Sequence, residues 1–255
     1  MPVAVKIILV VICSYFLGNI TFARPVSKAV NDDITAHGSG NPGTMNMMRT
    51  FGAKLGFLTL ILDLLKGVVC CLCAYYIFGG KDGGKLSMFM EYVAGFCCFI
   101  GHLYPVIFKF KGGKGVATAA GIGFCLNPIL MSIMAVTYFL VLLLCEIASL
   151  TSMTCVGLYV IIQTIFVCLS HNYWCLIPLW LILFFVIFAH RKNIVRMINH
   201  NENKMNIRKI FKKKNKSTSE SEDKETKDAK VESIESEQDL NNTEINNDVE
   251  NNIQK

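Results

Sequence analysis

Long apolar runs separated by short polar segments fill the first four-fifths of the chain. A helix needs roughly 20 apolar residues to cross the ~30 Å hydrocarbon core of a bilayer. Backbone groups cannot stay unpaired in lipid, and the runs lack the alternating pattern of a membrane β-strand, so each run is predicted to be a helix. The fold class is therefore all-α, a polytopic membrane bundle of about seven transmembrane helices. The predicted spans cover residues 3–22, 55–78, 89–108, 116–126, 129–147, 151–169 and 174–189.

The run over residues 116–126 is too short to cross a bilayer alone. It either extends through the turn at Asn127-Pro128 or forms a re-entrant half-helix inside the bundle, so seven and five crossings are both open. Seven crossings put Ser149 on the side of the basic loops, and five put it on the opposite side. The N-terminal run is interpreted as the first span, because no small-residue cleavage site follows it.

The composition changes abruptly near Met205. The whole chain is 53% hydrophobic and only 17% charged, against about 25% charged in most soluble domains. From Met205 onward almost every residue is polar, and such a segment cannot bury enough apolar surface to fold. The chain is therefore predicted to consist of a transmembrane domain, residues 1–204, and a charged, disordered C-terminal tail, residues 205–255.

Charge and cysteine content exclude some classes of function. The formal charge of +6 does not indicate a nucleic-acid partner, because the basic residues lie between apolar runs or in the tail. Most of the 11 cysteines lie inside apolar runs, where Cys behaves as a small hydrophobic residue. The one C-x-x-C, at Cys70 and Cys73, has no second pair of ligands, so neither a metal site nor a disulfide framework is predicted.

The basic residues between the predicted spans indicate the orientation. With an odd number of crossings, three basic segments fall on one side, and the positive-inside rule places them and the C-terminus in the cytoplasm of a multi-pass plasma-membrane protein. Those segments contain Arg24, Lys28, Arg49 and Lys54, then Lys109, Lys111 and Lys114, then Arg191, Lys192 and Arg196.

Three polar segments on that side carry candidate chemistry. Residues 38–49 satisfy G-x-G-x-x-G, but no βαβ unit surrounds them, so a dinucleotide site is excluded. Their glycine-rich backbone, with Ser39 and Arg49, suits phosphate instead. Residues 109–118 place glycines and Lys114 at a predicted helix N-terminus, which also attracts phosphate. In the third segment, residues 190–202, His190 and Asn193 share one helix face.

Two charged residues, Asp63 and Lys66, lie inside a predicted span, with Lys66 near the middle of the bilayer. Ionisable groups in a membrane are costly and are usually paired inside the bundle. Their i, i+3 spacing allows an ion pair. Structural support is favoured over a proton relay.

The order and spacing of these motifs from Leu17 to Glu202 resemble the bacterial acyl-phosphate:glycerol-3-phosphate acyltransferases, membrane enzymes of phospholipid synthesis. The family usually has glycine where this chain has His200. The residues that carry the resemblance include Gly38 to Asn41, Gly43, Asn46, Arg49, Asp63, Lys66, Gly67, Gly101, His102, Pro105, Lys109 to Thr118, His190, Arg191, Asn193, Ile194, Arg196 and Glu202.

The resemblance implies transfer of an acyl group from acyl phosphate to the 1-hydroxyl of glycerol 3-phosphate, giving lysophosphatidic acid and phosphate, with no cofactor and with membrane lipid as the surroundings. By resemblance, Ser39, Arg49 and Lys114 bind phosphate, His190 and Asn193 orient glycerol 3-phosphate, and Glu202 supports their loop. Further substrate- or phosphate-binding positions implied are Gly38, Gly40, Asn41, Gly43, Asn46, Gly112, Gly113, Gly115 and Thr118.

The alternative class of function is a membrane transporter of an organic phosphate. Transporters often contain internal repeats and bind substrate near the midplane of the bilayer. No repeat relates the two halves of this chain, and its motifs lie at one face. The His-x4-Asp motif of the other large acyltransferase class is also absent, which disfavours acyl-CoA or acyl-carrier-protein donors used through it.

Overall fold

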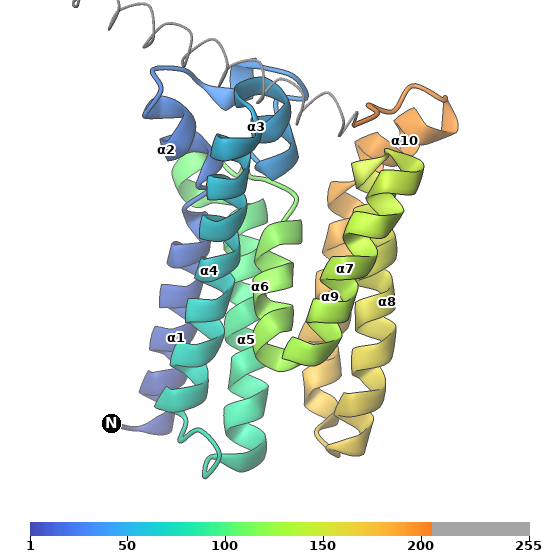
Figure 1. The fold of residues 1–255 in the computed structure, drawn as a ribbon. Helices are drawn as coiled ribbons and strands as arrows, with labels where there is room; N and C mark the ends of the chain where they lie inside the picture. The colour runs from blue at the N-terminus through green and yellow to red at the C-terminus, as the bar shows by residue number, and fades with distance from the viewer. Residues whose placement is uncertain (206–255) are drawn as a thin grey trace, which may run out of the picture. The chain divides into compact units, whose positions relative to one another are not determined.

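Every regular element in the computed structural model, which describes residues 1–205, is a helix (Figure 1). The all-α prediction is thus confirmed for this part of the chain, and the predicted tail lies outside the described residues apart from Met205. The elements are α1 (Val3–Asn19), α2 (Ala23–Lys28), η1 (Ile34–Ala36), α3 (Thr44–Phe51), α4 (Ala53–Ile77), α5 (Gly84–Leu103), η2 (Val106–Phe108), α6 (Val116–Leu126), α7 (Pro128–Cys145), α8 (Ala148–Leu169), η3 (Tyr173–Cys175), α9 (Leu176–Ala189) and α10 (Arg191–Ile198).

The described residues contain fewer full-length spans than the seven predicted. By length and composition, 5 helices can cross a membrane, or 6 if the segment from Tyr173 to Ala189 and the following α10, which meet at 51°, count as one bent span. Helix α6 has the predicted bounds but only 11 residues. At about 1.5 Å per residue it covers roughly half of the hydrocarbon core.

Helices α6 and α7 form a hairpin. Its turn is the Asn127-Pro128 pair: Oδ1 of Asn127 accepts a hydrogen bond from the Leu130 backbone at 3.1 Å and caps α7, and proline occupies the first helical position. In Figure 1 this turn ends short of the lower ends of α4, α5 and α8. Helix α7 then returns to the end of the bundle where α6 began.

The return of α7 decides the location of Ser149. Its hydroxyl donates to Oε1 of Glu202 at 3.1 Å, so Ser149 lies at the same end of the bundle as the third polar segment. This contact contradicts the location of Ser149 in the five-crossing alternative, which put it on the side opposite the third segment. The physical reason is that the short α6 is followed by an antiparallel α7 rather than by an outward crossing. The number of crossings itself stays a prediction.

Small residues let the helices of the first half pack closely. Helix α1 packs along α5, and α4 packs against both α5 and α6. A Cβ on Gly18 would lie 2.1 Å from the Cys98 carbonyl oxygen, and a Cβ on Gly101 would lie 2.2 Å from the Tyr15 carbonyl oxygen. Only glycine permits this approach of α1 and α5, as is common between membrane helices.

The remaining surface of the long helices is apolar. Leucine, isoleucine, valine and phenylalanine side chains of α1, α7, α8 and α9 are exposed, as expected for helices that face lipid. All 11 cysteines are free thiols.

Candidate active site

The first polar segment forms a loop held together by Asn46. Oδ1 of Asn46, in α3, accepts from the Ser39 backbone at 3.1 Å, while Nδ2 donates to the carbonyl oxygens of His37 at 3.0 Å and Ile34 at 3.3 Å. The side chain is buried, and all of its hydrogen-bonding groups are used inside the loop. Asn46 therefore shapes the loop from within rather than offering its amide to a ligand as predicted.

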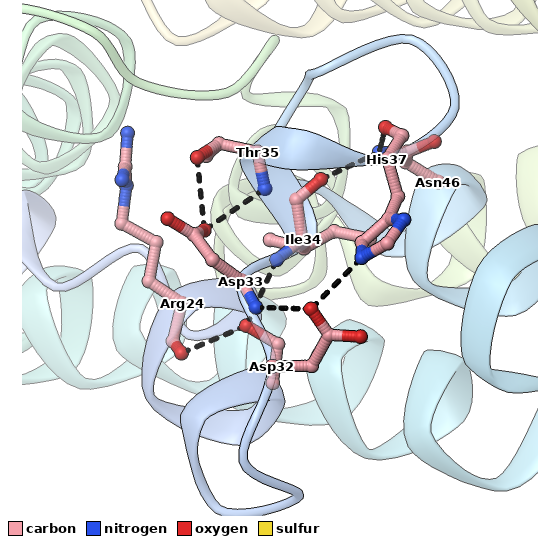
Figure 2. Close-up of polar contacts among 8 residues, drawn as sticks. Arg24, Asp32, Asp33, Ile34, Thr35, His37 and Asn46 are labelled. Carbon is pink, nitrogen blue, oxygen red and sulfur yellow. Dashed lines mark hydrogen bonds and ion pairs between the residues drawn. The ribbon is translucent and has the colours of Figure 1, made fainter.

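The residues just before this loop, Asp32 to His37, form a separate set of polar contacts (Figure 2). Oδ1 of Asp33 accepts from the backbone and the hydroxyl of Thr35, both at 2.9 Å, and so caps η1. Nε2 of His37 lies 2.8 Å from Oδ1 of Asp32. This hydrogen bond lowers the pKa of Asp32 below its usual value. This set of contacts was missed in the sequence, although an Asp directly before a helical turn, as Asp33 is here, is a recognisable capping signal.

Ser39 and Arg49, the two predicted phosphate ligands of this loop, are exposed. Gly38 and Gly40 have positive φ angles of 57° and 67°, which glycine tolerates without strain. The Ser39 hydroxyl makes no hydrogen bond within residues 1–205. The loop thus presents one hydroxyl and one guanidinium to solvent from a fixed backbone.

The second polar segment leads into α6. The first backbone bond at this helix end runs from Ala119 N–H to Gly115 C=O at 2.7 Å, so the N–H groups of Val116, Ala117 and Thr118 have no partner inside the helix. The Thr118 hydroxyl is buried and has no hydrogen-bond partner in the described part of the chain. Free donors at a helix N-terminus favour an anion.

Arg24 joins α2 to the second segment. Its Nη2 donates to the Lys111 carbonyl oxygen at 3.0 Å, and its guanidinium lies 4.5 Å from the centroid of the Phe108 ring. Its own carbonyl oxygen accepts from the Ser27 hydroxyl at 3.0 Å. From the sequence, Arg24 was predicted only as a positive-inside charge, because nothing local indicates a contact with Lys111, which is 87 residues further along the chain.

A hydrogen bond from Lys114 joins the second segment to the third. Nζ of Lys114 donates a hydrogen bond to Oδ1 of Asn193, and Nδ2 of Asn193 donates to Oε1 of Glu202 at 2.6 Å. Oε2 of Glu202 accepts from Nε of Arg196 at 2.8 Å. Glu202 therefore fixes both Asn193 and Arg196, and with them the face of α10 that points to Lys114.

The electrostatics of this cluster lower the pKa of Lys114. Burial lowers this pKa to about 8, the charges of Arg196 and Arg49 act in the same direction, and Glu202 opposes them. For Glu202, burial raises the pKa, but hydrogen bonds from Arg196, Asn193 and Ser149 outweigh it and leave the pKa below its usual value.

His190 lies between α9 and α10 and is buried. Its Nδ1 lies 2.8 Å from the Val186 carbonyl oxygen. Because a carbonyl oxygen only accepts, Nδ1 carries a hydrogen, and the neutral ring keeps its lone pair on Nε2. His190 can therefore offer an acceptor to a substrate hydroxyl.

Asp63 and Lys66 form the ion pair that their spacing allows. Nζ of Lys66 lies 2.8 Å from Oδ1 of Asp63, and both side chains are almost fully buried. Nζ also donates to the Ile20 carbonyl oxygen at 2.7 Å and lies 2.7 Å from Nδ1 of His102. The long side chain brings the amine to the end of α1, next to the polar segments. The depth of Lys66 in the bilayer stays a prediction.

Comparison with known proteins assigns the family. The glycerol-3-phosphate acyltransferase family model matches residues 8–200. A glycerol-3-phosphate acyltransferase 2 of Bacillus cereus is 38% identical over 202 residues, which cover 79% of this chain and 96% of that relative.

Solved structures show the same similarity. Crystal structures of PlsY (YgiH), an integral membrane glycerol 3-phosphate acyltransferase, match with 32% identity over 80% of this chain and 98% of that chain. The TM-score is 0.71 for the glycerol 3-phosphate form and 0.69 for the lysophosphatidic acid form. Since the family model and the curated relative both span most of the described residues, the chain belongs to the glycerol-3-phosphate acyltransferase family.

Proposed function

We propose that this chain transfers the acyl group of an acyl phosphate to the 1-hydroxyl of glycerol 3-phosphate, releasing lysophosphatidic acid and inorganic phosphate in phospholipid synthesis. The observation that carries the proposal is the cluster around Lys114. The ammonium of Lys114 is joined through Asn193 and Glu202 to the guanidinium of Arg196, and it lies directly before a helix N-terminus with free N–H donors at one end of an apolar bundle. This arrangement suits two phosphate-bearing substrates, one of which is a lipid-like acyl donor.

The relatives support the acceptor and the product. Solved structures of PlsY (YgiH) are described in glycerol 3-phosphate and lysophosphatidic acid forms. The acyl phosphate donor rests on the resemblance of the motifs. A transporter fits less well, because the charged cluster lies at one end of the bundle, whereas transporter sites lie near the midplane.

In this proposal the side chains of the site have different roles. Ser39, Arg49 and Lys114 bind phosphate oxygens, with the N–H groups of α6 assisting. His190 and Asn193 orient glycerol 3-phosphate, and Glu202 holds Asn193 in place. Because acyl phosphate is already activated, the main task is to bring two anions together and to offset their repulsion.

The proposed acyl transfer is balanced without a cofactor. The 1-hydroxyl oxygen of glycerol 3-phosphate forms a bond to the acyl carbon, and the bond from that carbon to the phosphate oxygen breaks. The hydroxyl proton passes to a substrate phosphate oxygen, so no side chain has to act as a general base. A steep dependence of rate on one titrating side chain other than a phosphate ligand would contradict this route.

We also propose that the three polar segments face the cytoplasm of a bacterial plasma membrane, by the distribution of Lys and Arg between the spans. In the same proposal residues 1–204 form the acyltransferase domain.

Purified protein, labelled glycerol 3-phosphate and a choice of donors test the function. We expect labelled lysophosphatidic acid with acyl phosphate and none with acyl-CoA. Product from acyl-CoA alone would overturn the donor assignment. No product from either donor, together with uptake of label into sealed vesicles that contain the protein, would favour the transporter.

A further inference from the structure

His102 lies in the last turn of α5. The glycine-rich second segment packs directly against it. The carbonyl oxygen of His102 accepts a hydrogen bond from the Gly113 backbone at 3.1 Å. A Cβ on Gly113 would lie 2.2 Å from Nε2 of the His102 ring, and a Cβ on Gly112 would lie 2.0 Å from the His102 carbonyl oxygen. Neither position has room for a methyl group.

These contacts change the interpretation of the two glycines. They were predicted to offer backbone N–H groups to phosphate, but the Gly113 N–H already donates to His102. Their lack of a side chain lets the segment lie directly on the end of α5. The next residue along the chain is Lys114, whose amine reaches Asn193. The location of His102 therefore sets where Lys114 and the start of α6 lie.

The His102 ring is itself held from the other side. Its Nδ1 lies 2.7 Å from Nζ of Lys66, and an ammonium can only donate, so Nδ1 is the acceptor and the hydrogen of the neutral ring is on Nε2, toward Gly113. Asp63 pairs with Lys66 at 2.8 Å and accepts from the Phe22 backbone at 3.4 Å. The ring is thus fixed by a buried ion pair that is also bonded to the end of α1.

A buried ion pair is costly, and replacing both partners with well-packed apolar residues often does not lower stability. Ionisable residues inside a membrane bundle are therefore expected to serve a function. We propose that His102 is a positioning residue for acyl transfer: its imidazole, oriented by the Asp63–Lys66 pair, supports Gly113 and thereby fixes Lys114 and the N-terminus of α6 in the geometry that binds substrate phosphate. This inference rests on the proposed function, because it acts through Lys114.

The variants His102→Asn and Gly113→Ala test the contact from both sides. Asparagine keeps an acceptor near the location of Nδ1 for Lys66 but removes Cε1 and Nε2, the atoms nearest to Gly113. We expect each variant to raise KM for at least one phosphate substrate by about 10-fold to 100-fold, with a smaller change in kcat, because a displacement near 1 Å is enough for losses of that size. Unchanged KM values in His102→Asn for both substrates would overturn the proposal.

The double variant separates direct contact from general weakening. A methyl group at position 113 would meet atoms that His102→Asn removes, so the KM increase of the double variant should be smaller than the product of the two single increases. Independent, multiplying effects would show that the ring does not act through Gly113. Gly95→Ala is the matched control in α5, since its Cβ would meet Ile122 at 2.9 Å and Cys71 at 3.0 Å, away from His102. It should lower Tm, leave KM unchanged and combine multiplicatively with His102→Asn.

A measurement that needs no acyl transfer distinguishes failure of the inference from failure of the proposed function. The titration of Lys114 is followed by trace acetylation at a series of pH values and mass spectrometry of the folded protein. Wild-type Lys114 should titrate near its pKa of about 8, and in His102→Asn the midpoint should rise as the segment loosens and Lys114 gains water. An unchanged midpoint would overturn the positioning role even in an inactive protein, whereas a wild type that makes no lysophosphatidic acid would overturn the function alone.

Discussion

Lys114 and Asn193 are 79 residues apart in the sequence, yet Nζ of one donates a hydrogen bond to Oδ1 of the other. The contact joins the start of α6 to α10 and brings together the second and third polar segments. Asn193 is held in turn by Glu202, so the amine of Lys114 has a fixed partner before any substrate arrives. Such preorganisation reduces the cost of ordering the site during the reaction.

The charge of Lys114 predicts an alkaline limit to activity. Because its pKa is lowered to about 8, the free enzyme loses the positive charge as pH rises through that value. The ratio kcat/KM, measured against pH, should fall above about pH 8. Lys114→Arg should move this limb to higher pH, because arginine keeps its charge. A limb that stays in place in Lys114→Arg would exclude Lys114 as its origin.

Removing either of the two predicted phosphate-binding cations should nearly abolish turnover. Arg49→Ala and Lys114→Ala each delete a charge that offsets the repulsion between two anionic substrates, which should cost roughly a few kcal/mol of transition-state binding. The measurement is kcat/KM on protein shown to be folded by its elution profile and Tm. Lys54→Ala is the matched control: Lys54 is a nearby exposed cation of α4 without a side-chain polar contact in the described residues, and its loss should leave activity within about 2-fold.

Glu202 should contribute to both stability and activity. Glu202→Gln replaces an acceptor of three hydrogen bonds with an amide whose NH2 group must face a donor, so Tm should fall and kcat/KM should fall with it. Ser149→Ala removes only one of the three donors and should have the smaller effect, about 1 kcal/mol in stability. Equal Tm values for wild type and Glu202→Gln would refute the supporting role.

The lowered pKa of Glu202 also gives the direction of a pH effect on stability. A carboxyl whose folded pKa is depressed stabilises the protein above its unfolded pKa of ~4.3, and this stabilisation is lost as pH falls through the folded value. The Tm difference between wild type and Glu202→Gln should therefore shrink on acidification below about pH 4.

His200 should be replaceable by glycine with a gain in stability. Its φ is 55°, in the left-handed region that glycine tolerates and most other residues do not. His200→Gly should raise stability by about 1 kcal/mol and leave activity unchanged. Asn31, with φ of 58°, is the matched control, because asparagine already tolerates this conformation and Asn31→Gly should gain less. A fall in Tm for His200→Gly would show that the imidazole makes a stabilising contribution larger than the strain.

Cysteine labelling tests the arrangement in the membrane. In a protein cleared of its native cysteines, Lys81→Cys, between α4 and α5, should react with an impermeant reagent added to intact cells. Lys111→Cys and Asn201→Cys should react only after the cells are opened, because both lie at the end of the bundle that carries the site. Reaction of Asn201→Cys but not of Lys111→Cys from outside would contradict the return of α7 to that end.

The sequence by itself determined the helices and most candidate site residues. Apolar run length located the spans to within a few residues and gave the bounds of α6, because helix formation in lipid depends on local composition. The spacing of Asp63 and Lys66 indicated their pairing for the same local reason. Glycine-rich and basic motifs marked Ser39, Arg49 and Lys114 as candidate phosphate ligands without reference to distant residues, and these roles stay predictions.

Only the tertiary structure decided which of these residues meet. Whether α7 returns beside Glu202, whether Asn46 turns its amide inward, and whether His102 lies under Gly113 all depend on how separate helices pack. Hydrophobic periodicity reports the face that a helix buries, but not the partner that covers it. His102 looks in sequence like any histidine at a helix end, and it becomes the third member of a buried cluster only because α4, α5 and the end of α1 converge on it.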